Sequence, residues 1–296
     1  MNQSSTRMQQ NQQRVIEKPL PFRLQFLAGG IAGVSEILTM YPLDTVKTRA
    51  QLATTKAPSI IQTLKDIVQK EGFSKLYKGI AAPILVEAPK RAIKFSANDQ
   101  YKSLYQDSFT NKQLLSIATG VSAGCTEAFI VVPFELVKIR LQDRNSIYKN
   151  TMECVKGIFR TEGPLAFYNG LEATLWRHAT WNGGYFGVIH SVKNVLPEAE
   201  TKQGELLRNF VAGAIGGTFG TAINTPYDVV KSRIQNQKPG DKTYGWTIPA
   251  IIKVGKAEGA SALYKGFLPK VLRLGPGGGI LLTVYAVMSD ILRPYA

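Results

Sequence analysis

The sequence predicts an all-α membrane protein with six transmembrane helices in three pseudo-symmetric repeats of about 95 residues, each with a short amphipathic helix between its two spans. Two observations predict this class. A motif that begins with proline occurs three times in register with a second motif. Each copy of the unit also holds two apolar segments of roughly the length needed to cross a bilayer.

The first motif combines a proline, an acid and two bases at fixed spacing. It reads "PLDTVKTRAQ" at 42–51, "PFELVKIRLQ" at 133–142 and "PYDVVKSRIQ" at 226–235, so the prolines are 91 and 93 residues apart. The second motif follows each copy as "EGFSKLYKG" at 71–79, "EGPLAFYNG" at 162–170 and "EGASALYKG" at 258–266. Chance does not place these markers in register three times, so the chain is a tripled unit.

The elements follow from this register. We expect a disordered tail over residues 1–20, then repeats over 21–107, 108–200 and 201–296. The first apolar segment of each repeat covers about 24–41, 115–132 or 208–225, and the second about 80–97, 171–189 or 267–288. Between them, stretches such as "SIIQTLKDIVQKEG" place their apolar residues on one helical face, which suits a helix on a membrane surface.

Small residues recur inside the first apolar segments. A Gly-x-x-x-Gly begins thirteen residues before each proline, and its glycines are Gly29 and Gly33, Gly120 and Gly124, and Gly213 and Gly217. We expect these glycines to let neighbouring helix backbones approach closely within lipid.

Composition sets the limits on function. The 296 residues carry a formal charge of +15, which calls for an anionic partner, and the two cysteines form no disulfide framework. An enzyme is not indicated, because we find neither a phosphate-binding loop nor a metal-ligand or Ser/His/Asp arrangement. A nucleic-acid-binding repeat would gather its bases on one exposed face, whereas here bases recur inside apolar segments. We therefore expect no cofactor, no metal and no nucleic acid.

The two repeated motifs resemble the signature of the mitochondrial carrier family over nearly the whole chain, about 22–293. The resemblance implies a multi-pass protein of the inner mitochondrial membrane, with its amphipathic helices on the matrix side. It also implies transport of small anionic metabolites by alternating access, and we expect the carrier to function as a monomer. Cardiolipin is the implied lipid partner, held at the helix starts that follow each Y-x-G.

The resemblance further implies a matrix gate. Each acid of the first motif is expected to pair with the lysine of the next repeat, giving Asp44 with Lys138, Glu135 with Lys231, and Asp228 with Lys47. The glutamines that end the motif are expected to hydrogen-bond beneath these pairs, namely Gln51, Gln142 and Gln235. A cytoplasmic gate is expected to be weak, because it retains Asp99, Lys102 and Lys193 but has His190 at one acid position.

The family's substrate contacts correspond here to Val86, Arg177 and Arg273, with neighbours Glu87, His178 and Leu274. Two arginines on different helices fit a molecule with two carboxylates, and His178 could donate to a keto oxygen. Helical spacing extends these faces to further candidates, namely Lys90, Arg91, Lys94, Trp181 and Asn182. Two readings stay open: Trp181 as packing or substrate wall, and the intramembrane acids Glu36 and Glu127 as functional groups or helix-to-helix contacts.

The stretches "LWRHATWNGGYFGVI" (175–189) and "PKVLRLGPGGGILLTVY" (269–285) narrow the substrate. They are similar to those of family members that exchange the 2-oxodicarboxylates 2-oxoadipate and 2-oxoglutarate. The alternative is another di- or tricarboxylate, such as malate or citrate.

Overall fold

The computed structural model describes residues 20–54, 59–197, 202–238, 240–241 and 243–295. Within these ranges the long elements are six helices: α2 (Phe22–Leu52), α4 (Ala81–Tyr105), α5 (Lys112–Gln142), α7 (Leu171–Val195), α8 (Lys202–Gln235) and α10 (Phe267–Leu292). The tail expected to be disordered lies outside the described residues except for Leu20. The predicted all-helical, six-span class is confirmed.

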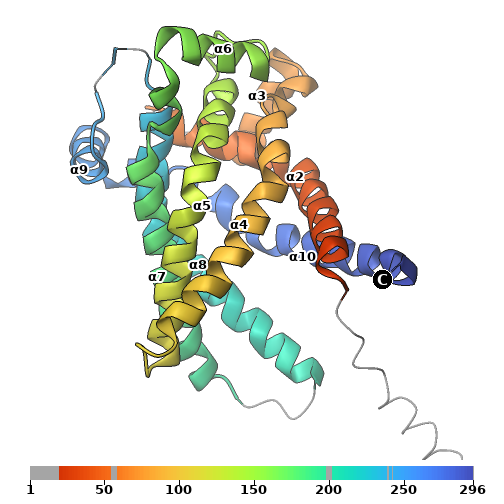
Figure 1. Cartoon of the computed structure of the whole chain (residues 1–296). Helices are drawn as coiled ribbons and strands as arrows, with labels where there is room; N and C mark the ends of the chain where they lie inside the picture. The colour runs from red at the N-terminus through yellow and green to blue at the C-terminus, as the bar shows by residue number, and fades with distance from the viewer. Residues whose placement is uncertain (1–19, 55–58, 198–201, 239, 242, 296) are drawn as a thin grey trace, which may run out of the picture.

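Short helices connect the two long helices of each repeat. They are α3 (Ile60–Lys70) with η1 (Phe73–Tyr77), α6 (Thr151–Thr161) with η2 (Pro164–Tyr168), and α9 (Thr247–Glu258) with η3 (Ala260–Tyr264); η4 (Arg293–Tyr295) ends the described chain. In Figure 1, α3, α6 and α9 lie around one end of the bundle. Side chains cap two of them: Ser59 accepts from the Gln62 amide, and Asn150 from that of Glu153.

The glycines of the second motif have a conformational reason to recur. Gly79, Gly170 and Gly266, which close the motif, have φ between +80° and +86°. Only glycine adopts this left-handed region without strain, and here it lets the chain turn from the short helix into α4, α7 or α10. The second motif therefore forms the same glycine turn in all three repeats.

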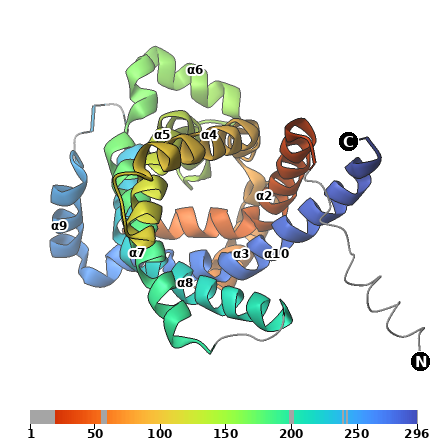
Figure 2. The same ribbon diagram turned by 60° about the horizontal axis from the view of Figure 1, so that its bottom comes forward.

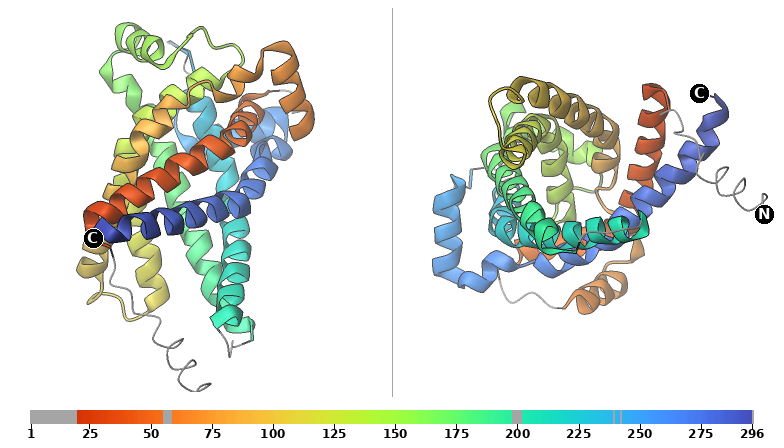
Figure 3. Two further views of the ribbon diagram at one scale, coloured as in Figure 1. Left: turned by 90° about the vertical axis from the view of Figure 1, so that its right-hand side faces the viewer. Right: turned by 90° about the horizontal axis from the view of Figure 1, so that it is seen from below.

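The three helix pairs close into a ring. Each second helix packs against the first helix of the next repeat: α4 on α5, α7 on α8, and α10 on α2. Figure 2 shows these helices arranged around a central axis, and Figure 3 shows α2 and α10 side by side, with the start of α2 next to the end of α10. The first and last repeats thus complete one another.

The long helices present apolar side chains outwards and polar ones inwards. Large exposed apolar residues include Phe26, Leu85, Phe95, Phe210 and Leu282, whereas Asp44, Glu87, Asp228 and Lys231 are buried. Within the described ranges, three helices are both long and apolar enough to cross a membrane, over Arg23–Leu52, Lys112–Gln142 and Ala260–Leu292. The shortest long helices have 25 residues, which corresponds to about 37 Å against a hydrocarbon core of about 30 Å.

The repeated Gly-x-x-x-Gly pairs were expected to bring the backbones of neighbouring helices close together, and the structure shows a different contact at their second glycines. Gly33, Gly124 and Gly217 face side chains of the neighbouring helix instead. The close backbone approach of α7 and α8 uses other glycines: a Cβ on Gly184 would lie 3.0 Å from the Cα of Gly220. The prediction of backbone contact at the repeated pairs was therefore wrong, and the space that they provide is filled by side chains.

Candidate functional site

A ring of charges joins α2, α5 and α8 where their prolines lie. Pro42, Pro133 and Pro226 stand inside continuous helices, and the acid and lysine follow within two turns. We name this set the charged ring; it comprises Asp44, Lys47, Glu135, Lys138, Asp228 and Lys231. Its three ion pairs each join neighbouring repeats: Lys138 with Asp44 at 2.8 Å, Lys47 with Asp228 at 2.9 Å, and Lys231 with Glu135.

Each ion pair of the charged ring includes a buried side chain, and burial explains why these side chains are paired. Asp44 is 8% exposed, Asp228 3% and Lys231 5%. An ionised side chain in so dry a place needs an opposite charge in contact, because its desolvation is otherwise uncompensated. The charged ring therefore ties the three repeats together at one end of the bundle.

Each acid of the charged ring also contacts a base from a second helix of a repeat. Arg273 Nη1 lies 2.6 Å from Asp44, and Lys270 Nζ lies 2.9 Å from Asp228. Arg177 Nη2 lies 3.5 Å from Glu135. Sequence reasoning missed Lys270, which stands in repeat three at a position held by Pro83 and Thr174 in the other repeats. A base at this position in one repeat only could have marked Lys270 as a functional residue from the sequence.

The three glutamines are buried, and the side chains of Gln51 and Gln142 have other hydrogen-bond partners than expected. Gln51 accepts from Ser232 at 2.8 Å, and Gln142 donates to Thr45 at 3.2 Å. Both polar side-chain atoms of Gln235 are buried without a hydrogen-bond partner among the described residues. In this conformation, no hydrogen bond joins a glutamine side chain to the charged ring within the described part of the chain.

A second set of pairs, which we call the Arg–Glu clamps, connects the two repeated motifs within each repeat. The arginine of the first motif binds both carboxylate oxygens of the glutamate that opens the second, as Arg49 with Glu71, Arg140 with Glu162, and Arg233 with Glu258. These arginines also donate through Nε to the carbonyl of the next repeat's glutamine, Gln142, Gln235 or Gln51. The clamps were not predicted, although both partners stand at fixed places in the motifs.

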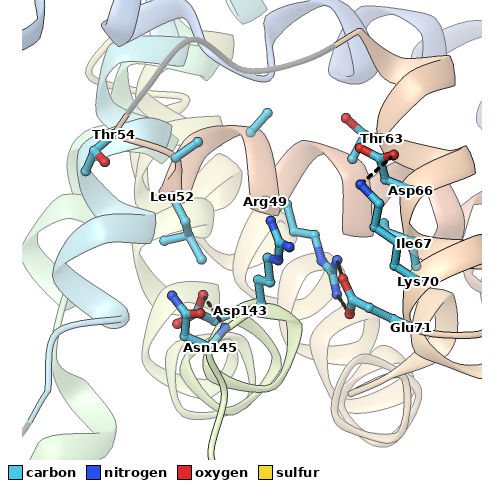
Figure 4. Close-up of a pocket in the computed structure, with 13 residues that line it drawn as sticks. Arg49, Leu52, Thr54, Thr63, Asp66, Ile67, Lys70, Glu71, Asp143 and Asn145 are labelled. Carbon is cyan, nitrogen blue, oxygen red and sulfur yellow. Dashed lines mark hydrogen bonds and ion pairs between the residues drawn. The ribbon is translucent and has the colours of Figure 1, made fainter.

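The first and third clamps favour the ionised form of their glutamates. The hydrogen bonds from Arg49 hold the pKa of the Glu71 carboxyl below its usual value, and those from Arg233 do the same for the pKa of Glu258. Figure 4 shows the first clamp in a pocket of about 380 Å³ between α2, α3 and the segment after α5, where Lys70 also pairs with Asp66. This pocket lies at the same end of the bundle as the short helices.

A central cavity of about 260 Å³ adjoins the charged ring. It collects most of the substrate contacts inferred from the sequence, together with part of the charged ring. The lining residues of these two groups are Val86, Glu87, Lys90, Arg91, Arg177, His178, Arg273, Asp44, Glu135 and Lys138. Glu36 and Glu127, the two acids with open roles, line it as well.

Charges in the central cavity balance. Its lining holds five acids and five bases, which are Glu36, Asp44, Glu87, Glu127 and Glu135 against Lys90, Arg91, Lys138, Arg177 and Arg273. Every one of these bases pairs with an acid; Glu87, for example, binds both Lys90 and Arg91, and Arg273 binds Glu36 as well as Asp44. An anion that enters the central cavity would therefore compete with a protein carboxylate for one of these bases.

Arg177 contacts a histidine and two acids of the charged ring, with Nη2 3.5 Å from Glu135 and Nε 3.8 Å from Asp228. Its Nη2 lies 3.0 Å from His178 Nε2, whereas its Nε is buried without a hydrogen-bond partner. Arginine only donates, so Nε2 of His178 accepts. Donation from His178 to a keto oxygen, as considered from the sequence, would have to come from Nδ1, which lies on the side of Gly124.

Three predicted contacts lie away from the central cavity. Trp181 stacks on Tyr185 with ring centroids 5.0 Å apart, which favours its packing role. Asn182 donates to the His178 carbonyl at 2.9 Å along its own helix. The side chain of Lys94 is 61% exposed, with its nearest acid, Glu127, 4.0 Å away.

The residues expected at the other gate form no ring in this conformation. Asp99 and Lys102 are exposed, and in the described part of the chain neither they nor Lys193 form an ion pair. The side chain of His190 lies outside the described residues. Among the described residues, the charged ring closes one end of the bundle, and Asp99, Lys102 and Lys193 form no such ring at the other.

Three helix pairs around a charged central cavity, closed at one end by ion pairs, define a membrane transporter. The family model "Mitochondrial carrier protein" matches residues 18–109, 110–200 and 202–296, and the chain belongs to this family. Its members are transporters of the inner mitochondrial membrane and not enzymes. The chain therefore carries small anionic substrates across that membrane.

Several named mitochondrial carriers are similar in sequence to this chain. The chain is 57% identical to "Mitochondrial citrate transporter D" of Aspergillus niger, over 94% of this chain and 96% of the relative. It is also 57% identical to "Probable mitochondrial 2-oxodicarboxylate carrier" of Dictyostelium discoideum, over 93% of each chain. Identity to "Mitochondrial 2-oxodicarboxylate carrier 2" of Saccharomyces cerevisiae is 51%, over 93% of this chain and 96% of the relative.

Proposed function

We propose that this carrier exchanges 2-oxodicarboxylates, with 2-oxoglutarate and 2-oxoadipate as substrates, by alternating access through the central cavity. The observation that carries the proposal is the placement of Arg177 on α7 and Arg273 on α10 in one cavity. Two guanidinium groups on different helices match two carboxylates at the ends of a short chain. The names of several relatives support the same substrate class.

The contacts of the arginines suggest how binding is coupled to movement. Arg273 and Arg177 contact Asp44 and Glu135 of the charged ring. A bound dicarboxylate would take over these arginines, and each acid would keep only its ring lysine. Because a buried acid depends on its partners, the charged ring would then open more readily. The charged ring acts in this scheme as the matrix gate.

The second gate follows from the same scheme. With the charged ring formed, and with Asp99, Lys102 and Lys193 outside any ion pair among the described residues, this conformation corresponds to a cavity open to the cytoplasm. Closure on that side would rely on Asp99, Lys102 and Lys193, and hence on few ion pairs.

Lipid and assembly are part of the proposal. The amides at the starts of α4, α7 and α10, next to the glycine turns, suit a phosphate of cardiolipin. The ring of helices encloses the cavity within one chain, so we propose that the carrier works as a monomer.

A second candidate substrate is citrate or another di- or tricarboxylate. It is favoured by the relative named as a citrate transporter and by Lys90 and Arg91, which add cations to the cavity. A third carboxylate could take these two bases from Glu87.

Reconstitution separates the candidates. The purified protein in liposomes loaded with 2-oxoadipate should take up labelled 2-oxoglutarate, and internal malate, citrate, phosphate and ATP should be compared as counter-substrates. Exchange should be lost from empty liposomes. Faster exchange with citrate or malate than with either oxoacid would favour the second candidate, and exchange of ATP or phosphate alone would contradict both.

A further inference from the structure

The second glycine of each Gly-x-x-x-Gly faces an equivalent position on the neighbouring helix. Gly33 on α2 faces Glu87, Gly124 on α5 faces His178, and Gly217 on α8 faces Leu274. These three partners each follow the first substrate contact of their helix, namely Val86, Arg177 or Arg273. The threefold repetition indicates that the glycines serve the residue pairs that line the cavity.

A Cβ would meet the least movable atoms at Gly124, because at Gly33 the nearest atoms are the ends of the flexible Glu87 and Arg91 side chains. A Cβ on Gly124 would lie 3.0 Å from Nδ1 of His178 and 3.1 Å from its Cβ. The Cβ of His178 is fixed to the α7 backbone, so the ring cannot avoid a methyl group simply by bending at its far end. At Gly217, the Cβ would lie an ordinary 3.6 Å from Leu274. An alanine at 124 therefore requires His178 to shift by a few tenths of an ångström, whereas an alanine at 217 fits at an ordinary contact distance.

The imidazole that Gly124 accommodates is in contact with Arg177. Because arginine has donors only, the 3.0 Å contact between its Nη2 and His178 Nε2 needs an unprotonated Nε2. His178 is then neutral in this contact, with its proton on Nδ1. One donor of the Arg177 guanidinium is thus held by an uncharged acceptor that does not compete for its charge.

The backbone beneath Arg177 is held as well. Asn224 of α8 donates to the Arg177 carbonyl at 2.9 Å. Arg177 is thus held at its backbone carbonyl and at Nη2, whereas its buried Nε forms no hydrogen bond among the described residues and lies 3.8 Å from Oδ1 of Asp228. A carboxylate ligand needs a guanidinium that is held in place, and the acids around Arg177 lie at 3.5 and 3.8 Å, too far for strong hydrogen bonds to compete with the ligand.

We propose that Gly124 is a positioning residue for substrate binding, because its missing side chain gives His178 the space to hold Arg177 in place. The inference rests on the proposed function, in which Arg177 binds a substrate carboxylate. It assigns a role to a residue of α5 that does not itself touch the substrate.

The experiment is a double-substitution cycle on the protein in liposomes, with 2-oxoglutarate, malate and citrate as test anions. Gly124→Ala should raise the KM of the transported anion about tenfold, the loss expected for one hydrogen bond to a charged group, with kcat nearly unchanged. His178→Ala should have a similar effect. His178→Gln, whose amide oxygen can replace Nε2 as acceptor, should retain most of the affinity.

The double variant carries the decisive result. In a His178→Ala background the methyl group of Ala at 124 has no ring to displace, so Gly124→Ala should add no further loss. Gly183→Ala is the matched control, since a Cβ there meets nothing within 4 Å. Losses that add up in the double variant, or a Gly124→Ala protein that matches the control, would overturn the inference alone. A wild type that exchanges none of the three anions would overturn the proposed function and this inference with it.

Discussion

Arg273 of α10 donates to Asp44 of α2 across 2.6 Å, where Asp44 also accepts from Lys138 of α5 at 2.8 Å. One carboxylate thus joins the last helix, the first helix and the middle repeat. Asp44 is almost fully buried and pairs with both bases, and Arg273 has a second acid partner in Glu36. Arg273, a proposed substrate-binding residue, is therefore in direct contact with Asp44 of the charged ring.

Loss of the Asp44 charge should destabilise the substrate-free carrier. In Asp44→Asn, Lys138 and Arg273 both lose a buried partner, and removal of one member of a buried pair costs about 3 kcal/mol or more. We expect the unfolding temperature in detergent to fall by at least about 5 °C. Asp66→Asn is the control, because its pair with Lys70 is a partly exposed one within a helix turn and should contribute little. Equal melting of the two variants would contradict the account.

The pair between Glu135 and Lys231 allows a test by exchange of charges. Glu135→Lys places a third base beside Arg177 and Lys231, and Lys231→Glu places an acid beside Asp228, so each single variant should melt lower than the wild type. The double variant restores an opposite pair and should melt higher than either single variant. Additive destabilisation in the double variant would show that the two side chains do not interact.

The Arg–Glu clamps predict a pH dependence. Arg49 holds the pKa of Glu71 below its usual value, so the ionised carboxyl is favoured in the folded protein. That stability is fully present above the unfolded pKa of about 4.3 and is lost as pH falls through the lower folded pKa. Glu71→Gln should therefore melt well below the wild type at pH 7, and the difference should shrink as the pH falls below about 4.

Asp107→Asn serves as the control for this measurement. Asp107 is exposed, at the end of α4. Its substitution should leave the melting temperature unchanged at either pH. A difference for Glu71→Gln that stays constant with pH would mean that the clamp acts by shape and not by charge.

Much of the fold and the charged ring could be predicted from the sequence, because triplication turns a weak local pattern into a register. A single "PYDVVKSRIQ" is compatible with a surface turn. Three copies with equal offsets require three helices that meet at equivalent points, and the acid of one copy then lies near the lysine of the next. The observed pairs, such as Lys47 with Asp228 at 2.9 Å, follow that register.

The remaining contacts depend on how the helices tilt and rotate, which spacing does not give. Arg273 and Lys270 contact acids of the charged ring because α10 passes close to those acids. The two bases lie on the second long helix of their repeat, whereas the charged ring comes from the first long helices. The glycine pairs illustrate the same limit. Their spacing predicts a small-residue face, but only the packing shows that side chains such as His178 occupy it.

The central claim is that Arg177 and Arg273 together bind a substrate with two carboxylates. The most direct measurement is the initial rate of 2-oxoglutarate exchange in liposomes for Arg177→Ala and Arg273→Ala, each compared with the exposed α6 variant Arg160→Ala. The account predicts loss of exchange in both cavity variants, with folded protein shown by a cooperative melting transition, and a wild-type rate for Arg160→Ala. A wild-type rate in either cavity variant would contradict it.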